Sequence, residues 1–169
     1  MKGCTRSYSF AVHSRTYILD KKRTTKVWPW KQGPIKKSRF PLFKDNKPLG
    51  PAWHWRAAKL ESATAQYRLL VQLRQDKPNF KAWLAVEIEE HWAVIGRLES
   101  HHHAGLHVHL QCPDKGIAVD QIDPPDAVTV PHWKRYHRRA NDVLSTTQAW
   151  ELALKFFRAQ TGETGQLGL

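Results

Sequence analysis

Five of the ten histidines in this 169-residue chain fall within nine residues, at His101, His102, His103, His107 and His109. In a β-strand, side chains at positions i and i+2 point to the same face of the sheet. Glu99 and His101 therefore share a face, as do His107 and His109. We expect the two pairs to lie on adjacent strands of a hairpin with its loop at 102–106. In that register 101 lies opposite 107, and 99 lies opposite 109.

Imidazoles and a carboxylate on one sheet face suit two kinds of chemistry. The set Glu99, His101, His107 and His109 offers nitrogen and oxygen ligands for a divalent metal ion, with Mn, Mg and Zn as the candidates. The same groups could instead transfer protons without a metal. A solvent-facing hairpin that is merely rich in histidine is the alternative to both. Cys112 has the parity of the apolar residues of its strand, which indicates a core thiol rather than a ligand.

The segment Leu106-His107-Val108-His109-Leu110-Gln111 resembles the HUH motif of the replication-initiator, relaxase and small-transposase nucleases. In that family, the two motif histidines hold a divalent metal on an antiparallel sheet. The resemblance therefore implies that His107 and His109 are metal ligands. It also implies that Glu99 or His101 completes the set.

The same resemblance implies a nucleophile that attacks a single-stranded phosphodiester. Tyr136-His137-Arg138-Arg139 is similar to the initiators' Tyr-x-x-Lys, so Tyr136 is the candidate nucleophile and Arg139 takes the lysine position. A second resemblance is to the JAMM metalloproteases, whose His-x-His-x10-Asp pattern would end at Asp120. In that case Glu99 would be the upstream base.

A third resemblance needs no metal. A helix followed by an antiparallel sheet with His, Glu and Arg on its open face is similar to the small ribonuclease toxins. This resemblance implies that His101 or His107 forms an acid/base pair with Glu99. Arg97, which shares their parity, would be the cation that stabilises the phosphorane.

The spacing of apolar residues predicts the elements that position these side chains. Apolar residues at helical intervals predict a helix over 56–75. Strands are expected at 82–88, 92–101, 106–112 and 127–130. The capping box Ser145-Thr146-Thr147-Gln148 predicts a last helix, ended by Gly162. We therefore expect an α+β fold, an antiparallel three- to four-stranded meander with two helices packed on one face.

The chain carries a net charge of +12, and its distribution predicts the domain organisation. Residues 1–49 hold 13 Lys or Arg against two acidic residues, a net charge of +11, whereas residues 50–169 hold 14 basic and 13 acidic residues. We expect an extended basic arm at 1–52, a compact core at 53–161 and a tail at 162–169. A solvated basic tail, or an extension that the core does not use, is the alternative for the arm.

Basic and aromatic residues together predict contact with nucleic acid, because cations neutralise phosphates and aromatic rings stack on bases. In the arm, the candidates are Lys21, Lys22, Arg23, Trp28, Trp30, Lys36, Lys37 and Phe40. In the core, the stretch 132–139 adds Lys134, Arg135, Arg138 and Arg139. A solvated loop is the alternative for that stretch.

These observations predict a nucleic-acid-binding phosphodiesterase or nuclease that uses the His/Glu site and acts on single-stranded DNA or RNA. The competing class is a non-enzymatic module, in which the hairpin binds metal or a partner and the arm binds nucleic acid non-specifically. A protein partner or inhibitor is a further candidate in either class. Two cysteines exclude a disulfide-rich secreted scaffold. No apolar run approaches the roughly 20 residues of a membrane span, and no secretory signal is apparent, so we expect a cytoplasmic protein.

Overall fold

The computed structural model describes residues 16–101, 105–111, 128–130 and 143–162, and these residues are mostly β-structure. The strands are β1 (Lys22–Val27), β2 (Ile35–Lys36), β3 (Asn46–Lys47), β4 (Trp53–Glu61), β5 (Gln66–Arg74), β6 (Asn79–Ile88), β7 (His91–His101), β8 (Gly105–Leu110), β9 (Val128–Val130) and β10 (Ala159–Gln160). Helix α2 spans Thr146–Phe156, and residues 16–19 form one further helical turn.

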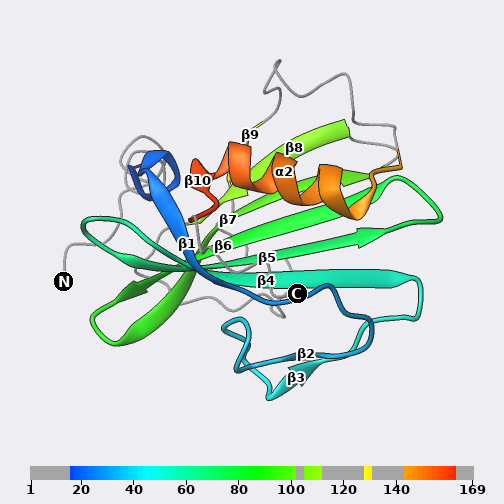
Figure 1. Ribbon diagram of the computed structural model, residues 1–169, viewed down its shortest axis with the longest axis horizontal. Coiled ribbons are helices and arrows are strands. Elements are labelled where there is room, and N and C mark those ends of the chain that lie inside the picture. The colour runs from blue at the N-terminus through cyan, green and yellow to red at the C-terminus, as the bar shows by residue number, and fades with distance from the viewer. Residues whose placement is uncertain (1–15, 102–104, 112–127, 131–142, 163–169) are drawn as a thin grey trace, which may run out of the picture.

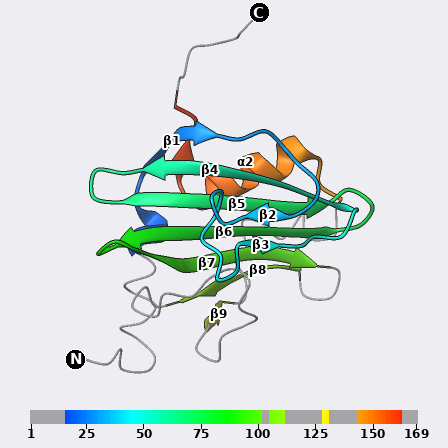
Figure 2. The ribbon, with the colours of Figure 1, turned by 90° about the horizontal axis from the view of Figure 1, so that it is seen from below.

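Eight strands form one sheet in the order β10-β1-β4-β5-β6-β7-β8-β9, and β2 pairs with β3 in a separate ribbon. All neighbours in the large sheet are antiparallel except β1 and β10, which pair in parallel. Helix α2 lies against one face of the curled sheet and the β2–β3 ribbon lies against the other (Figure 1). Figure 2 shows β1, β4, β5, β6, β7, β8 and β9 succeeding one another across the large sheet. The expected α+β meander of three to four strands with two packed helices is therefore wrong.

The expected helix over 56–75 is a hairpin of two strands. β4 and β5 pair along their whole length, from Trp53 opposite Arg74 to Glu61 opposite Gln66. In the turn between them, the Ser62 hydroxyl accepts hydrogen bonds from the backbone N–H groups of Thr64 and Ala65, at 3.2 and 3.1 Å. This serine performs the turn-forming role that glycine or proline often fills, so the chain reverses without a conventional breaker.

The sheet separates two hydrophobic cores. The core under α2 includes Leu69, Leu84, Ile95, Val108, Trp150 and Phe157. The core on the opposite face packs Trp28, Ile35, Phe40 and Leu42 against Trp55, Leu70 and Trp83. The expected extended basic arm is therefore wrong from residue 22 onward. This segment supplies a central strand pairing and one of the two cores.

The other element predictions fare better. The strands expected at 82–88, 92–101, 106–112 and 127–130 correspond to β6, β7, β8 and β9. The capping box of α2 is confirmed, because the Ser145 side chain accepts from the Gln148 N–H and the Gln148 side chain accepts from the Ser145 N–H. The predicted end of this helix is wrong, since α2 ends at Phe156 and the chain then forms β10. The Gly162 N–H donates to Thr24 Oγ1 at 2.9 Å, so this glycine packs against β1 instead.

Candidate metal centre

Glu99, His107 and His109 lie on the face of the sheet opposite α2, on the neighbouring strands β7 and β8. A β-bulge in β7 decides that face, because Ala85 pairs with Val94 but Leu84 pairs with Gly96. One extra residue in β7 therefore reverses the parity of the positions that follow it. A glycine fits at position 96, where a Cβ atom would lie 3.0 Å from Ile18 Cδ1.

The register of the β7–β8 hairpin differs by two residues from the one expected. Glu99 pairs with His107, Arg97 pairs with His109, and His101 pairs with Gly105. The expected pairings of 99 with 109 and of 101 with 107 are therefore wrong, because the hairpin closes with a shorter loop. A slip of two residues keeps every side chain on its face, so the shared face of Glu99, His107 and His109 is confirmed.

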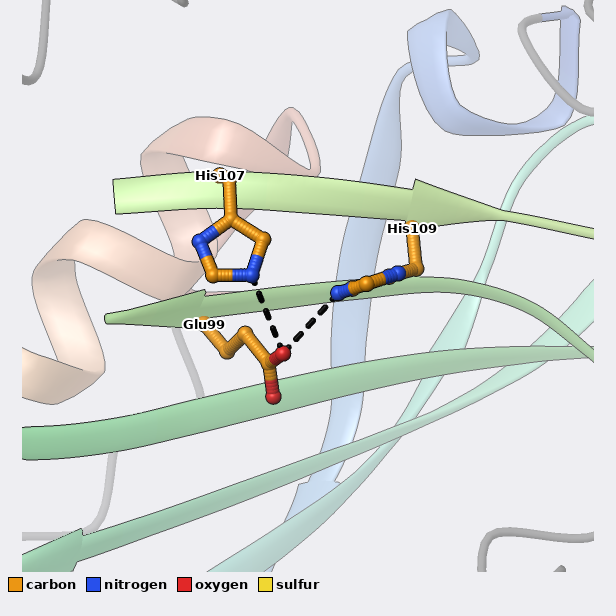
Figure 3. A group of neighbouring side chains, drawn as sticks. All are labelled: Glu99, His107 and His109. Carbon is orange, nitrogen blue, oxygen red and sulfur yellow. Dashed lines mark hydrogen bonds and ion pairs between the residues drawn. The ribbon is translucent and has the colours of Figure 1, made fainter. Parts of the chain in front are cut away.

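Both imidazoles reach the same oxygen of Glu99 (Figure 3). His107 Nε2 lies 3.1 Å and His109 Nε2 lies 2.9 Å from Glu99 Oε1. The two rings meet edge to face, with centroids 5.0 Å apart and planes at 70°. All three ligand atoms lie within 4.8 Å of one another.

This convergence has the dimensions of a metal-binding group. Two atoms bound at right angles to one ion, each at about 2.1 Å, are about 3.0 Å apart. The distances from Glu99 Oε1 to the two Nε2 atoms fall at this value. Two imidazoles and one carboxylate are ligands that Zn, Mn and Fe accept, with further positions left for water or substrate. The group can therefore hold a divalent metal ion.

The second carboxylate oxygen is held by cations. Arg97 Nε lies 3.2 Å and Lys81 Nζ lies 3.8 Å from Glu99 Oε2, while Arg97 Nη2 donates to Oε1 at 3.3 Å. Burial alone would raise the pKa of Glu99. The hydrogen bond from His109 and the charges of Arg97 and Lys81 outweigh burial and lower the pKa to about 2. Glu99 is therefore ionised and fixed in orientation, as a ligating carboxylate needs to be.

The centre is shielded but reachable. Glu99 is 5% exposed, whereas the side chains of His107 and His109 retain 10% and 16% of their exposure. A row of paired positions, Gln72, Lys81, Glu99 and His107, crosses four strands on this face. Lys81 was missed by sequence reasoning, because the strand expected at 82–88 began one residue too late. Extending that strand by one residue would still have placed Lys81 opposite Leu98, because the bulge in β7 is what shifts the pairing to Glu99.

Several residues expected to contact nucleic acid are part of the folded interior. Trp28 and Phe40 are buried in the core opposite α2, so their rings are not available to stack on bases. Lys22 is 3% exposed, and its ammonium group donates to three backbone carbonyls instead of facing solvent. Trp30 is half-buried against the core under α2.

The remaining basic candidates of the segment lie at the surface. Lys21, Lys36 and Lys37 are exposed. Arg23 is exposed too and forms an ion pair with Glu61. These side chains can contact a polyanion, although they lie on the surface of a folded unit and not on a free arm.

The other predicted residues lie outside the part of the chain that the structure describes: His102, His103, Cys112, Asp120, Lys134, Arg135, Tyr136, Arg138 and Arg139. For His101 the backbone alone is placed, at the end of β7. The set that the structure brings together is therefore Glu99, His107 and His109, with Arg97 and Lys81 as its neighbours.

Among the described residues, no helix has the length and apolar character needed to cross a membrane. Comparison of the chain with protein-family models, with curated proteins and with solved structures gives no match.

Proposed function

We propose that this protein is a metal-dependent phosphodiesterase that acts on single-stranded nucleic acid, with the ion held by Glu99, His107 and His109. The observation that carries the proposal is the convergence of two Nε2 atoms and one carboxylate oxygen at ligand-to-ligand distances. A bound divalent ion would polarise a phosphoryl oxygen and lower the pKa of a coordinated water.

The residues around the centre support a phosphate substrate. Arg97 and Lys81 carry two positive charges beside the single negative charge of Glu99. This side of the sheet is therefore positive before any ion binds, which favours an anionic substrate over a neutral one. The exposed Lys36 and Lys37 lie in the segment that packs on this same face, and they add positive charge to this side of the molecule.

Proton transfer without a metal is the second candidate function, and the same two cations favour it. A divalent ion must bind next to Arg97 and Lys81, whose charges oppose it. In a metal-free mechanism His107 or His109 would take the proton of a ribose hydroxyl, and Glu99 would orient the imidazole. Arg97 would then stabilise the charge that develops on phosphate. This chemistry would be restricted to RNA.

Metal titration and cleavage assays on the purified chain test both candidates. We expect Mn²⁺ or Zn²⁺ to bind with one ion per chain by calorimetry, and His109→Ala to abolish this binding. His91→Ala is the matched control, because His91 is an exposed histidine of the same sheet that lies away from the centre. Cleavage of single-stranded oligonucleotides should be lost in EDTA and restored by added metal.

A further pair of variants tests the supporting cation. Arg97→Met should lower metal affinity about 10-fold, because the loss of the group that orients Glu99 outweighs the loss of a charge that opposes the ion. Arg74→Met removes an arginine whose ion pair, with Asp76, is elsewhere, and it should leave affinity unchanged. RNA cleavage that survives EDTA would replace the metal mechanism by the proton-transfer mechanism. Stoichiometric metal binding with no cleavage of any nucleic acid would show a binding module.

A further inference from the structure

A cavity of about 510 Å³ lies at the other end of the face that carries the metal centre. Its wall is formed by the segment from Lys37 to Phe43, by Arg68 of β5, and by Glu90, His91 and Trp92 at the start of β7. Trp92 pairs with Glu87 on β6, and Glu99 pairs with Lys81, six residues further along that strand. At 3.3 Å per residue, the cavity and the centre are about 20 Å apart.

Arg68 is the central group of this cavity. Its guanidinium carbon lies 5.8 Å from the centroid of the Trp28 ring and 5.1 Å from that of the Trp92 ring. The Arg68 Nη1 atom is buried and has no hydrogen-bond partner among the described residues. Arg68 as a whole is only partly buried and lines the cavity, so its guanidinium group offers a charged donor to an anionic oxygen that enters.

The remaining lining groups combine positive charge with aromatic surface. Among the lining residues Lys37 and Arg68 are cations and Glu90 is a carboxylate, and Glu87 lies close enough to affect Arg68 electrostatically. Phe40 and Trp92 provide apolar walls, and Phe43 is 69% exposed. An exposed aromatic ring beside a stacked arginine suits a ligand that has both a phosphate and a planar ring.

The turn that forms one side of the cavity is conformationally costly. Glu89 and Glu90, the two residues between β6 and β7, have positive φ angles of 45° and 68°. Such turns strongly favour Asn and Gly, so two glutamates there carry strain, which tends to cluster at binding sites. The turn sets Glu90 and His91 at the rim of the cavity.

We propose that this cavity binds one nucleotide of a single-stranded nucleic acid, with its phosphate on Arg68 and Lys37 and its base against the aromatic wall. The identity of the ligand as substrate rests on the proposed function, since the strand would continue along the same face toward Glu99. Trp83 lies between the two positions but is 4% exposed beneath the segment 28–49, so the strand would cross the outer surface of that segment. The cavity therefore fixes a strand several nucleotides from the metal centre.

Binding of a fluorescein-labelled oligothymidylate to the full chain tests this proposal. The measurement is made in EDTA, where cleavage cannot interfere, with fluorescence anisotropy as the readout. We expect Arg68→Met to weaken binding at least 10-fold. Phe43→Ser alters an exposed ring that folding does not need, and it should weaken binding about 3-fold. Arg74→Met, also on β5 but outside the cavity, is the matched control for lost charge and should bind nearly as the wild type does.

Unchanged affinity in both Arg68→Met and Phe43→Ser would overturn the proposal. So would inorganic phosphate that competes as well as thymidine 5′-monophosphate does, because the aromatic wall would then contribute nothing. The outcome is separable from the proposed function. Binding that depends on Arg68 without any cleavage would remove the phosphodiesterase and keep the nucleotide site. Cleavage together with binding that does not depend on Arg68 would keep the phosphodiesterase and remove the nucleotide site.

Discussion

Lys22 is the residue at which three segments of the chain meet. Its ammonium group donates to the backbone carbonyls of Ile18, Asp20 and Phe157, at 3.1, 2.7 and 3.0 Å. The Lys22 Nζ atom lies 4.8 Å from the centroid of the Tyr67 ring, and the Tyr67 hydroxyl donates a hydrogen bond to Asp20. One buried cation thus ties the first helical turn and β1 to the end of α2.

The titration of Lys22 predicts an unusual pH dependence of stability. Burial lowers the pKa of Lys22 to about 8, although the charge of Asp20 opposes the change. Between this value and the ordinary pKa of 10.5, the unfolded chain holds a proton that the folded chain has lost. Stability therefore rises with pH in this window, by about 2 kcal/mol between pH 7.5 and 9.5.

Urea denaturation of Lys22→Met and of Lys21→Met over that pH range isolates the effect. Lys21 is exposed, so Lys21→Met should keep the rise seen in the wild type. Lys22→Met should lose it, because methionine fills the same space without a charge. Parallel pH curves for the two variants would contradict the assignment of the rise to Lys22.

The faces of the site residues could be predicted from sequence, but their contacts could not. Alternation is intact in β8, where Leu106, Val108 and Leu110 are buried and the two histidines between them are only partly buried. Alternation fixes a face whatever the register, so His107 and His109 were placed correctly. The register depends on the length of the hairpin loop, which local pattern does not determine.

At the scale of elements, β5 shows why a strand was taken for a helix. Six of its nine residues are buried, because α2 covers one face of the sheet and residues 28–49 cover the other. A strand buried on both faces loses its period of two, and its Leu and Gln residues then favour a helix. In contrast, the capping box of α2 is a local signal that needs no tertiary contact, and it was predicted correctly.

The substitution Gly96→Ala tests how tightly the side chains pack around the bulge of β7. The Cβ atom of Gly96→Ala would lie 3.0 Å from Ile18 Cδ1 and 3.6 Å from Phe157 Cε1. We expect Gly96→Ala to destabilise the fold by about 1 kcal/mol, since a well-packed core tolerates an added methyl group poorly.

A second substitution in the same core checks this explanation. Ile18→Val removes the Cδ1 atom that makes the closest contact with the new methyl group. Thermal denaturation of the double variant should therefore show a smaller loss than the sum of the two single losses. Strict additivity would mean that Ile18 does not limit the space at position 96.

At the scale of the whole molecule, the basic segment from residue 22 to residue 49 is structural. β1 pairs with β4 and β10, and Trp28, Ile35, Phe40 and Leu42 cover the face of the sheet opposite α2. Each of these apolar residues docks separately, so the segment has no hydrophobic period and resembles a free arm in sequence. Its lysines and arginines lie mostly on the outside of a folded unit.

Removal of residues 1–52 should therefore prevent folding. The shortened chain would expose Leu70, Trp83 and the rest of the core opposite α2 to water, at a cost of roughly 25 cal/mol for each Å² of apolar surface. We expect it to lose the cooperative unfolding transition of the full chain in circular dichroism and to aggregate. A truncated chain with a sharp transition of its own would show that residues 53–169 form an independent domain.

The parallel pairing of β1 with β10 has a consequence for how the chain is made. Residues 22–27 leave the ribosome well before residues 159–160, which follow only after the whole of residues 28–158. During synthesis the strands from β4 to β8 can pair in succession. One edge of β1 stays without its partner strand, and the Lys22 ammonium group lacks the hydrogen bond that it donates to the Phe157 carbonyl. The nascent protein therefore carries an unpaired strand edge until residues 159–160 have been made, and a chaperone that shields such edges would matter most before that point.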